Sequence, residues 1–124
     1  MSGTGKEFFD RHMKYIMAND VVGMVTETYT EDAILFNAFN FLPEPPPNII
    51  QGRAALIDAF QKYLAYQGEI KVTSLYNFLD SPNAISFQAT FDSPKTGSWA
   101  VGDCWLMRDG KIYHHIGFAH NIKP

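Results

Sequence analysis

Asp103 is the residue whose type and setting first suggest chemistry. The surrounding sequence alternates in a way that would place Asp103 on one face of a strand together with Trp99, Val101, Trp105 and Met107. Burying a carboxyl group among aromatic side chains is costly and favours its protonated form. Asp103 is therefore predicted to be a general acid or an oxyanion donor, with an ordinary pairing to a polar neighbour as the alternative.

Two adjacent histidines, His114 and His115, follow in the next predicted strand. Neighbouring residues of a strand point to opposite faces, so at most one of them can face the same side as Asp103. Simple alternation favours His114, which would share its face with Ile112, Ile116 and Phe118. Histidine titrates near neutral pH, so the one that faces the interior is a candidate base, and the other is interpreted as a core or interface residue.

Further polar and aromatic residues could complete such a site. Tyr15 could hydrogen-bond a substrate carbonyl, although packing is the simpler interpretation. Phe36, Trp99 and Trp105 are expected to line an apolar wall.

Helices and strands must position these residues. Helical spacing of apolar residues predicts helices over 7–18, 21–30 and 53–64. Stretches rich in β-formers predict strands over 33–39, 69–79, 84–91, 98–107 and 111–121, with short turns between the last four. The result is an α+β fold in the order α-α-β-α-β-β-β-β, with a curved antiparallel sheet over helices.

A proline-rich segment, 42–48, interrupts both kinds of element and predicts a loop. With Phe39, Phe41 and Leu42, this loop either covers the mouth of a pocket or connects its neighbours rigidly. Asp20 lies between the first two predicted helices and is interpreted as the cap of the second.

Composition limits the function classes. A length of 124 residues indicates one domain, 1–124. A net charge of −3 without a Lys/Arg run argues against nucleic acid. The single cysteine, Cys104, and the histidine spacing predict neither a disulfide nor a metal site, and no glycine motif predicts a nucleotide cofactor. Without an export signal or a membrane-length apolar run, the expectation is a cytoplasmic protein with no membrane partner.

Four short phrases follow one another along the chain: YIMAND at 15–20, YTEDA at 29–33, IQGRAAL at 50–56 and WLMRDGKI at 105–112. In this order they resemble the SnoaL-like polyketide cyclases, ketosteroid isomerases and relatives of the nuclear transport factor 2-like superfamily. The resemblance covers nearly the whole chain. It implies a cone-shaped sheet with an apolar pocket between sheet and helices, and often a homodimer joined through the sheet. It implies no single reaction, because the superfamily also holds proteins that only bind partners.

Single positions carry part of the resemblance. Ketosteroid isomerases place the aspartic acid of their oxyanion hole on the strand equivalent to that of Asp103. The pocket-lining positions of their last strand fall in register with His115 rather than His114, so the resemblance favours His115. Their carboxylate base would fall at Asn37, an amide, which argues against a steroid-isomerase mechanism at that residue.

Dehydratase relatives contain a Tyr and Asp pair that Tyr15 and Asp20 resemble. Those relatives also need a histidine near the end of the third helix, and this chain has none over 63–68. The pair alone therefore does not indicate a dehydratase.

The sequence predicts a cofactor-independent acid–base enzyme that isomerises, cyclises or dehydrates an apolar, carbonyl-bearing small molecule such as a polyketide- or steroid-like compound. Asp103 would be the acid or oxyanion donor, His115 the base, and Tyr15 with Asn37 would orient the substrate. The alternative is a non-catalytic module of the same fold that binds small molecules or assembles with proteins.

Overall fold

The fold was obtained as a computed structural model, which describes residues 5–38 and 47–123. The elements follow in the order α1 (Gly5–Met17), α2 (Val21–Thr28), β1 (Tyr29–Asn37), β2 (Asn48–Gln51), α3 (Arg53–Gln67), β3 (Lys71–Asp80), β4 (Ala84–Ser93), β5 (Gly97–Arg108) and β6 (Lys111–Lys123). The predicted loop with Phe39, Phe41 and Leu42 lies outside the described residues.

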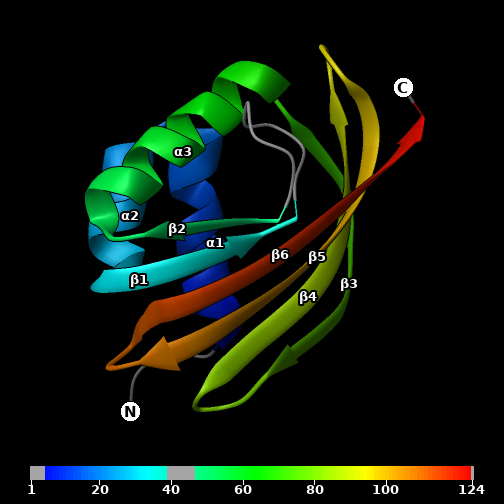
Figure 1. Ribbon diagram of the computed structural model, residues 1–124. Coiled ribbons are helices and arrows are strands. Elements are labelled where there is room, and N and C mark those ends of the chain that lie inside the picture. Colours follow the sequence, from blue (N-terminus) through cyan, green and yellow to red (C-terminus); the bar gives the residue numbers. More distant parts are fainter. Residues whose placement is uncertain (1–4, 39–46, 124) are drawn as a thin grey trace.

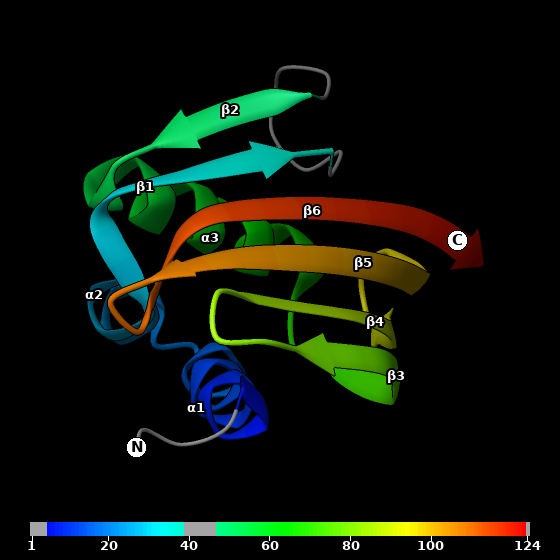
Figure 2. The same ribbon diagram turned by 90° about the horizontal axis from the view of Figure 1, so that it is seen from below.

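The strands form one open sheet in the order β2-β1-β6-β5-β4-β3 (Figure 2). Strands β3 to β6 make the predicted antiparallel meander, whereas β1 pairs with β6 in parallel. The sheet is therefore mixed, and the expectation of a wholly antiparallel sheet was wrong at this one pairing. The short edge strand β2 was not predicted; it forms because Ile49 and Ile50 favour extended backbone and can pair with β1.

The helices all lie on the concave side of the curved sheet, which gives the cone-shaped α+β architecture (Figure 1). Phe9 of α1 contacts aromatic rings of three strands, Phe78, Phe87 and Trp105. Phe60 of α3 packs on the same concave side, where it meets Tyr29 at the start of β1. The interior between helices and sheet is consequently rich in aromatic side chains.

The junction between α1, α2 and β1 depends on local capping. Asp20 caps α2 as predicted, because its Oδ1 accepts a hydrogen bond from the Gly23 amide at 2.9 Å. A Cβ atom at Gly23 would lie 2.9 Å from the Tyr15 ring, so glycine permits that close approach. At Tyr29 the backbone turns extended, and β1 begins four residues earlier than predicted.

One irregularity sets which residues of β6 face the interior. Leu106 of β5 pairs with His114, but Met107 pairs with Ile112, so Tyr113 is an extra residue that forms a β-bulge. The bulge interrupts the alternation of faces, and both Ile112 and His115 are buried. The simple alternation that grouped Ile112 with His114 was therefore wrong, because it assumed an unbroken strand.

Candidate active site

Asp103 and His115 form a buried pair on the inner face of the sheet. Asp103 lies opposite Gly117 across β5 and β6, so His115 is its diagonal neighbour and no facing side chain separates the two. Nε2 of His115 lies 2.7 Å from Oδ1 of Asp103. The exposed fractions of the two side chains are only 10% for Asp103 and 7% for His115. A short hydrogen bond in such a dry place offsets much of the cost of burying the carboxyl group.

A third residue, Tyr29, extends the pair. Its hydroxyl oxygen lies 2.7 Å from Nδ1 of His115, so both nitrogens of the imidazole ring have protein partners. Tyr29 is fully buried, and burial together with the charge of Asp103 raises its pKa well above the usual range. The sequence analysis did not identify Tyr29. Its hydroxyl lies beside His115 only because β1 pairs with β6, and the sequence does not show that pairing.

Aromatic rings enclose the imidazole of His115. The rings of Tyr29 and Phe60 stack against it with centroids 6.0 and 6.3 Å away, and the edge of Trp105 approaches to 5.9 Å. Because these rings exclude water, hydrogen bonds and charges act more strongly here than at the surface.

A second buried histidine, His12 of α1, lies beside this group. Its Nδ1 is 3.1 Å from Oγ1 of Thr28, and that hydroxyl donates its own hydrogen to the Met24 carbonyl at 2.5 Å. The hydroxyl of Thr28 must therefore accept a hydrogen from Nδ1 of His12. Burial, with a smaller contribution from nearby His115, lowers the pKa of His12 to about 3, so this ring is neutral at physiological pH.

Tyr63 of α3 approaches the site from the helical side. It is buried, and burial followed by the charge of Asp103 raises its pKa above the usual range. Tyr63 packs in a cluster with Ile70, Phe91 and Trp99. The sequence analysis placed Tyr63 only within the predicted helix over 53–64 and gave it no role in the site.

Asn37 of β1 shares the inner face of the sheet with the pair. It is fully buried and lies opposite Gly117, which in turn lies opposite Asp103. Asn37, Gly117 and Asp103 thus form one row across three strands, and glycine places no side chain between the two polar ones.

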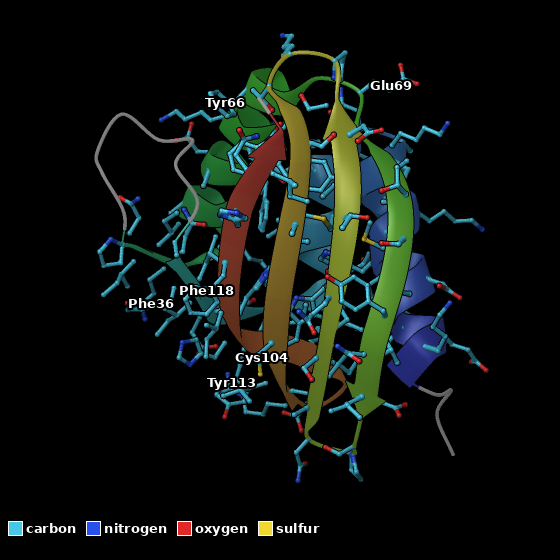
Figure 3. All side chains as sticks on the ribbon, turned by 90° about the vertical axis from the view of Figure 1, so that its right-hand side faces the viewer. Phe36, Tyr66, Glu69, Cys104, Tyr113 and Phe118 are labelled. Carbon is cyan, nitrogen blue, oxygen red and sulfur yellow. The ribbon has the colours of Figure 1, made fainter. Side chains whose placement is uncertain are left out.

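Two other predicted site residues, Tyr15 and Phe36, lie away from the pair. Tyr15 lies at the junction of α1 and α2 over Gly23, and among the described residues it makes no hydrogen bond to the pair. Phe36 faces outwards, since it alternates with buried Leu35 and Asn37, so its expected place in the pocket wall was wrong (Figure 3).

The two tryptophans differ in their packing. Trp105 is buried in the main core, in edge contact with His115. Trp99 is buried in the cluster around Tyr63, and its indole N–H donates to Oγ1 of Thr96 at 2.8 Å.

A hollow of about 450 Å³ opens between the ends of α1 and α3 and the start of β3. Its lining is formed by Ile16, Met17, Ala18, Asn19, Leu64, Gly68, Glu69 and Ile70. The hollow does not include Asp103 or His115, but Leu64 and Ile70 also contact the Tyr63 and Trp99 cluster. It therefore adjoins the interior on the side of that cluster.

Within 5–38 and 47–123, no group of three or more His, Cys, Asp or Glu side chains could hold a metal ion. None of the helices in the same ranges is long and apolar enough to cross a membrane.

Comparison with known proteins gives the fold. No protein-family model and no curated protein matches the sequence. Among solved structures, a nuclear transport factor 2-like (NTF2-like) protein of unknown function from Mesorhizobium loti superposes with a TM-score of 0.72 at 16% identity, over 94% of this chain and 90% of that one.

Two more structures agree. IdmH from Streptomyces antibioticus, a candidate polyketide cyclase, gives a TM-score of 0.73 at 15% identity over 95% of this chain and 93% of IdmH. A cystatin-fold protein from Novosphingobium aromaticivorans gives 0.73 at 12% identity, over 94% and 99%. The resemblance stated from the sequence is thus confirmed for the architecture. The chain has the nuclear transport factor 2-like fold.

Proposed function

We propose that the chain is a cofactor-independent acid–base enzyme for an apolar, carbonyl-bearing small molecule, such as a polyketide- or steroid-like compound. The observation that carries this proposal is the hydrogen bond between Asp103 and His115, nine-tenths buried among aromatic rings. A carboxyl group and an imidazole held together away from water are suited to moving a proton at a carbon next to a carbonyl group.

Asp103 is the member of the pair that meets the substrate. Both nitrogens of His115 are within hydrogen-bond distance of Tyr29 and Asp103, whereas Asp103 uses Oδ1 for its bond within the described residues. Oδ2 therefore exchanges the proton with the substrate. His115 holds the carboxyl group in place through the hydrogen bond to Oδ1. This differs from the sequence-based prediction, in which His115 itself was the base.

Asn37 is the substrate-orienting group in this proposal. Adjacent strands are about 4.8 Å apart, so Asn37 and Asp103 lie about 10 Å apart across Gly117. If the carbonyl oxygen of a substrate lies near Asn37, the substrate carbon next to that carbonyl is within reach of Asp103 in this row. Trp99 and Trp105 supply apolar surface on either side along β5.

Exchange of hydrogen for deuterium next to a carbonyl tests the proposal without knowledge of the natural substrate. A cyclic aryl ketone and a steroid enone are incubated with the protein in heavy water, and exchange is followed by proton NMR. We expect the Asp103→Asn variant to lose exchange activity by about 100-fold or more. The Asp92→Asn variant is the matched control, because Asp92 is exposed on β4 and its carboxylate accepts a hydrogen bond from Ser98.

A small-molecule-binding module without catalysis is the second candidate. The near-complete burial of Asp103 and His115 favours it, since a pair sealed in the core could be purely structural. This candidate predicts that ketones bind in calorimetry equally well to wild type and Asp103→Asn, without exchange in either. Exchange that disappears only in Asp103→Asn would exclude it.

We also propose a homodimer joined through the outer face of the sheet. Phe36 and Phe118, on neighbouring strands β1 and β6, are exposed on this face, and Cys104 and Tyr113 lie beside them (Figure 3). Exposed aromatic side chains that gather on one face are typical of an interface between copies.

A further inference from the structure

The hydroxyl hydrogen of Tyr29 fixes the direction of the hydrogen bonds in the site. Tyr29 is fully buried, and His115 is the side chain that the described structure places within hydrogen-bond distance of its oxygen. If Nδ1 of His115 carried a hydrogen, Tyr29 would have to accept it, and its own hydrogen would be buried without an acceptor. Because a buried donor without a partner is costly, the hydroxyl of Tyr29 donates to Nδ1.

The position of the hydrogen on His115 follows from this step. With Nδ1 acting as an acceptor, the hydrogen of neutral His115 resides on Nε2 and points at Oδ1 of Asp103. We propose that Tyr29 is a positioning residue that orders these bonds, so that Asp103 works as a carboxylate base and not as an acid. What the carboxylate does to a substrate rests on the proposed function, but the order of the hydrogen bonds does not.

Three other ionisable groups lie around the ring of His115. His12 lies on the side of α1 and stays neutral, because burial and the nearby His115 lower its pKa to about 3. Tyr63 approaches Asp103 from α3 and keeps its proton. Asp103 faces Nε2 of His115, on the opposite side of the ring from Tyr29.

Nitrogen NMR of the ring tautomers tests the proposal on the resting protein. With histidine labelled by nitrogen-15, two-dimensional spectra show which ring nitrogen carries the hydrogen. We expect His115 to carry it on Nε2. His12 is the internal reference, because its bond to Thr28 requires the opposite tautomer, with the hydrogen on Nδ1. Finding the hydrogen of His115 on Nδ1 in the wild type would overturn the proposal, and that result needs no variant to fold.

The Tyr29→Phe variant separates positioning from packing, since it keeps the ring and removes the hydroxyl. We expect His115 to take up its second proton at a pH higher by about one unit, which is about a tenfold gain in proton affinity. Thr28→Val is the matched control, because it removes the partner of His12 and leaves the bond from Tyr29 in place. An unchanged titration of His115 in Tyr29→Phe would show that Tyr29 only packs.

The two proposals fail in different ways. Loss of the predicted tautomer with ketone exchange intact would remove the role of Tyr29 and leave the acid–base function. The predicted tautomer without any ketone exchange would leave the hydrogen-bond order and remove the function.

Discussion

At the scale of single residues, the interior holds two histidines with opposite hydrogen-bond patterns. His12 gives its Nδ1 hydrogen to Thr28, whereas His115 receives a hydrogen from Tyr29 at the same ring position. Their rings lie close enough for the charge of one to affect the other. The neutral state of His12 depends on its burial, so acid should destabilise the fold through this residue.

The stability of the protein should therefore decrease in mild acid through His12. In the unfolded chain His12 takes up a proton near its ordinary pKa of 6.5, whereas in the native state the pKa is about 3. Between these values the unfolded state binds more protons, so the free energy of unfolding falls as pH falls, by up to about 1.4 kcal/mol per pH unit. Urea unfolding at about pH 7.5 and at about pH 4.5 measures this loss of unfolding free energy.

The variant His12→Asn identifies the source of this pH dependence. We expect its loss of stability between the two conditions to be smaller than that of the wild type by about 2 kcal/mol. His120→Asn is the control, because His120 is exposed on β6. If both variants lost as much stability as the wild type, another group would be responsible.

The sequence indicated part of this residue-scale arrangement. Asp103 stood out because a carboxyl group among aromatic residues is unusual, and His115 because of its register in related proteins. Tyr29 and Tyr63 could not be found in the same way, since each reads as an ordinary aromatic residue until β1 and α3 are brought beside β6. The outward position of Phe36 could have been found, because Asn37 next to it must face the opposite side.

At the scale of elements, Arg53 at the start of α3 holds the preceding helix and strand together. Its Nη2 donates to the carbonyl of Tyr29 at 2.7 Å and to that of Thr26 at 3.2 Å. These carbonyls lie where α2 ends and β1 begins, and a cation there also interacts well with the helix dipole. Arg53 therefore fixes the backbone that carries the Tyr29 side chain.

Replacing Arg53 by an uncharged residue should lower the free energy of unfolding. We expect Arg53→Met to lower the free energy of unfolding by about 1.5–3 kcal/mol, because it removes hydrogen bonds from a charged group to carbonyls. Arg11→Met is the comparison, since Arg11 is exposed on α1 and lies over the ring of Phe8; a change within about 0.5 kcal/mol is expected there. Equal losses in urea unfolding would contradict the role assigned to Arg53.

Element types were largely predictable from the sequence, because long periodic segments carry a strong signal. Helix α3 begins at Arg53 as predicted, but it ends at Gln67, three residues beyond the predicted end at residue 64. The next residue, Gly68, has a positive φ, which is common where helices end. Strand β2 escaped prediction because it has only four residues. The bulge at Tyr113 escaped because an extra residue in a strand leaves no mark on composition or hydropathy.

At the scale of the whole molecule, the sheet separates two surfaces of different character. Its concave face carries the buried polar group and lies under the helices, while its outer face exposes aromatic and aliphatic side chains, Phe118 among them. The order of elements was enough to predict a curved sheet over helices. The parallel contact of β1 with β6 depends on how distant segments meet, and local patterns do not record it.

The outer face gives a direct test of the proposed homodimer. Phe118 is 57% exposed on β6, and Phe118→Asp places a charge that would be buried between two copies. Sedimentation velocity should show a dimer for the wild type and a monomer for this variant. Leu79→Asp, at a residue 69% exposed on β3, should remain dimeric. A monomeric wild type, or equal dissociation by both variants, would contradict the proposed interface.

The bulge at Tyr113 has a consequence for aligning this chain with other members of its fold. A relative whose last strand is regular would be one residue shorter at this point. An alignment drawn without a gap could match its interior positions to Ile112 upstream of the bulge or to His115 downstream of it, but not to both. The gap belongs beside Tyr113. With the gap at that position, Ile112 and His115 align with the interior residues of the relative. A search for partners of a carboxylate equivalent to Asp103 then compares equivalent positions.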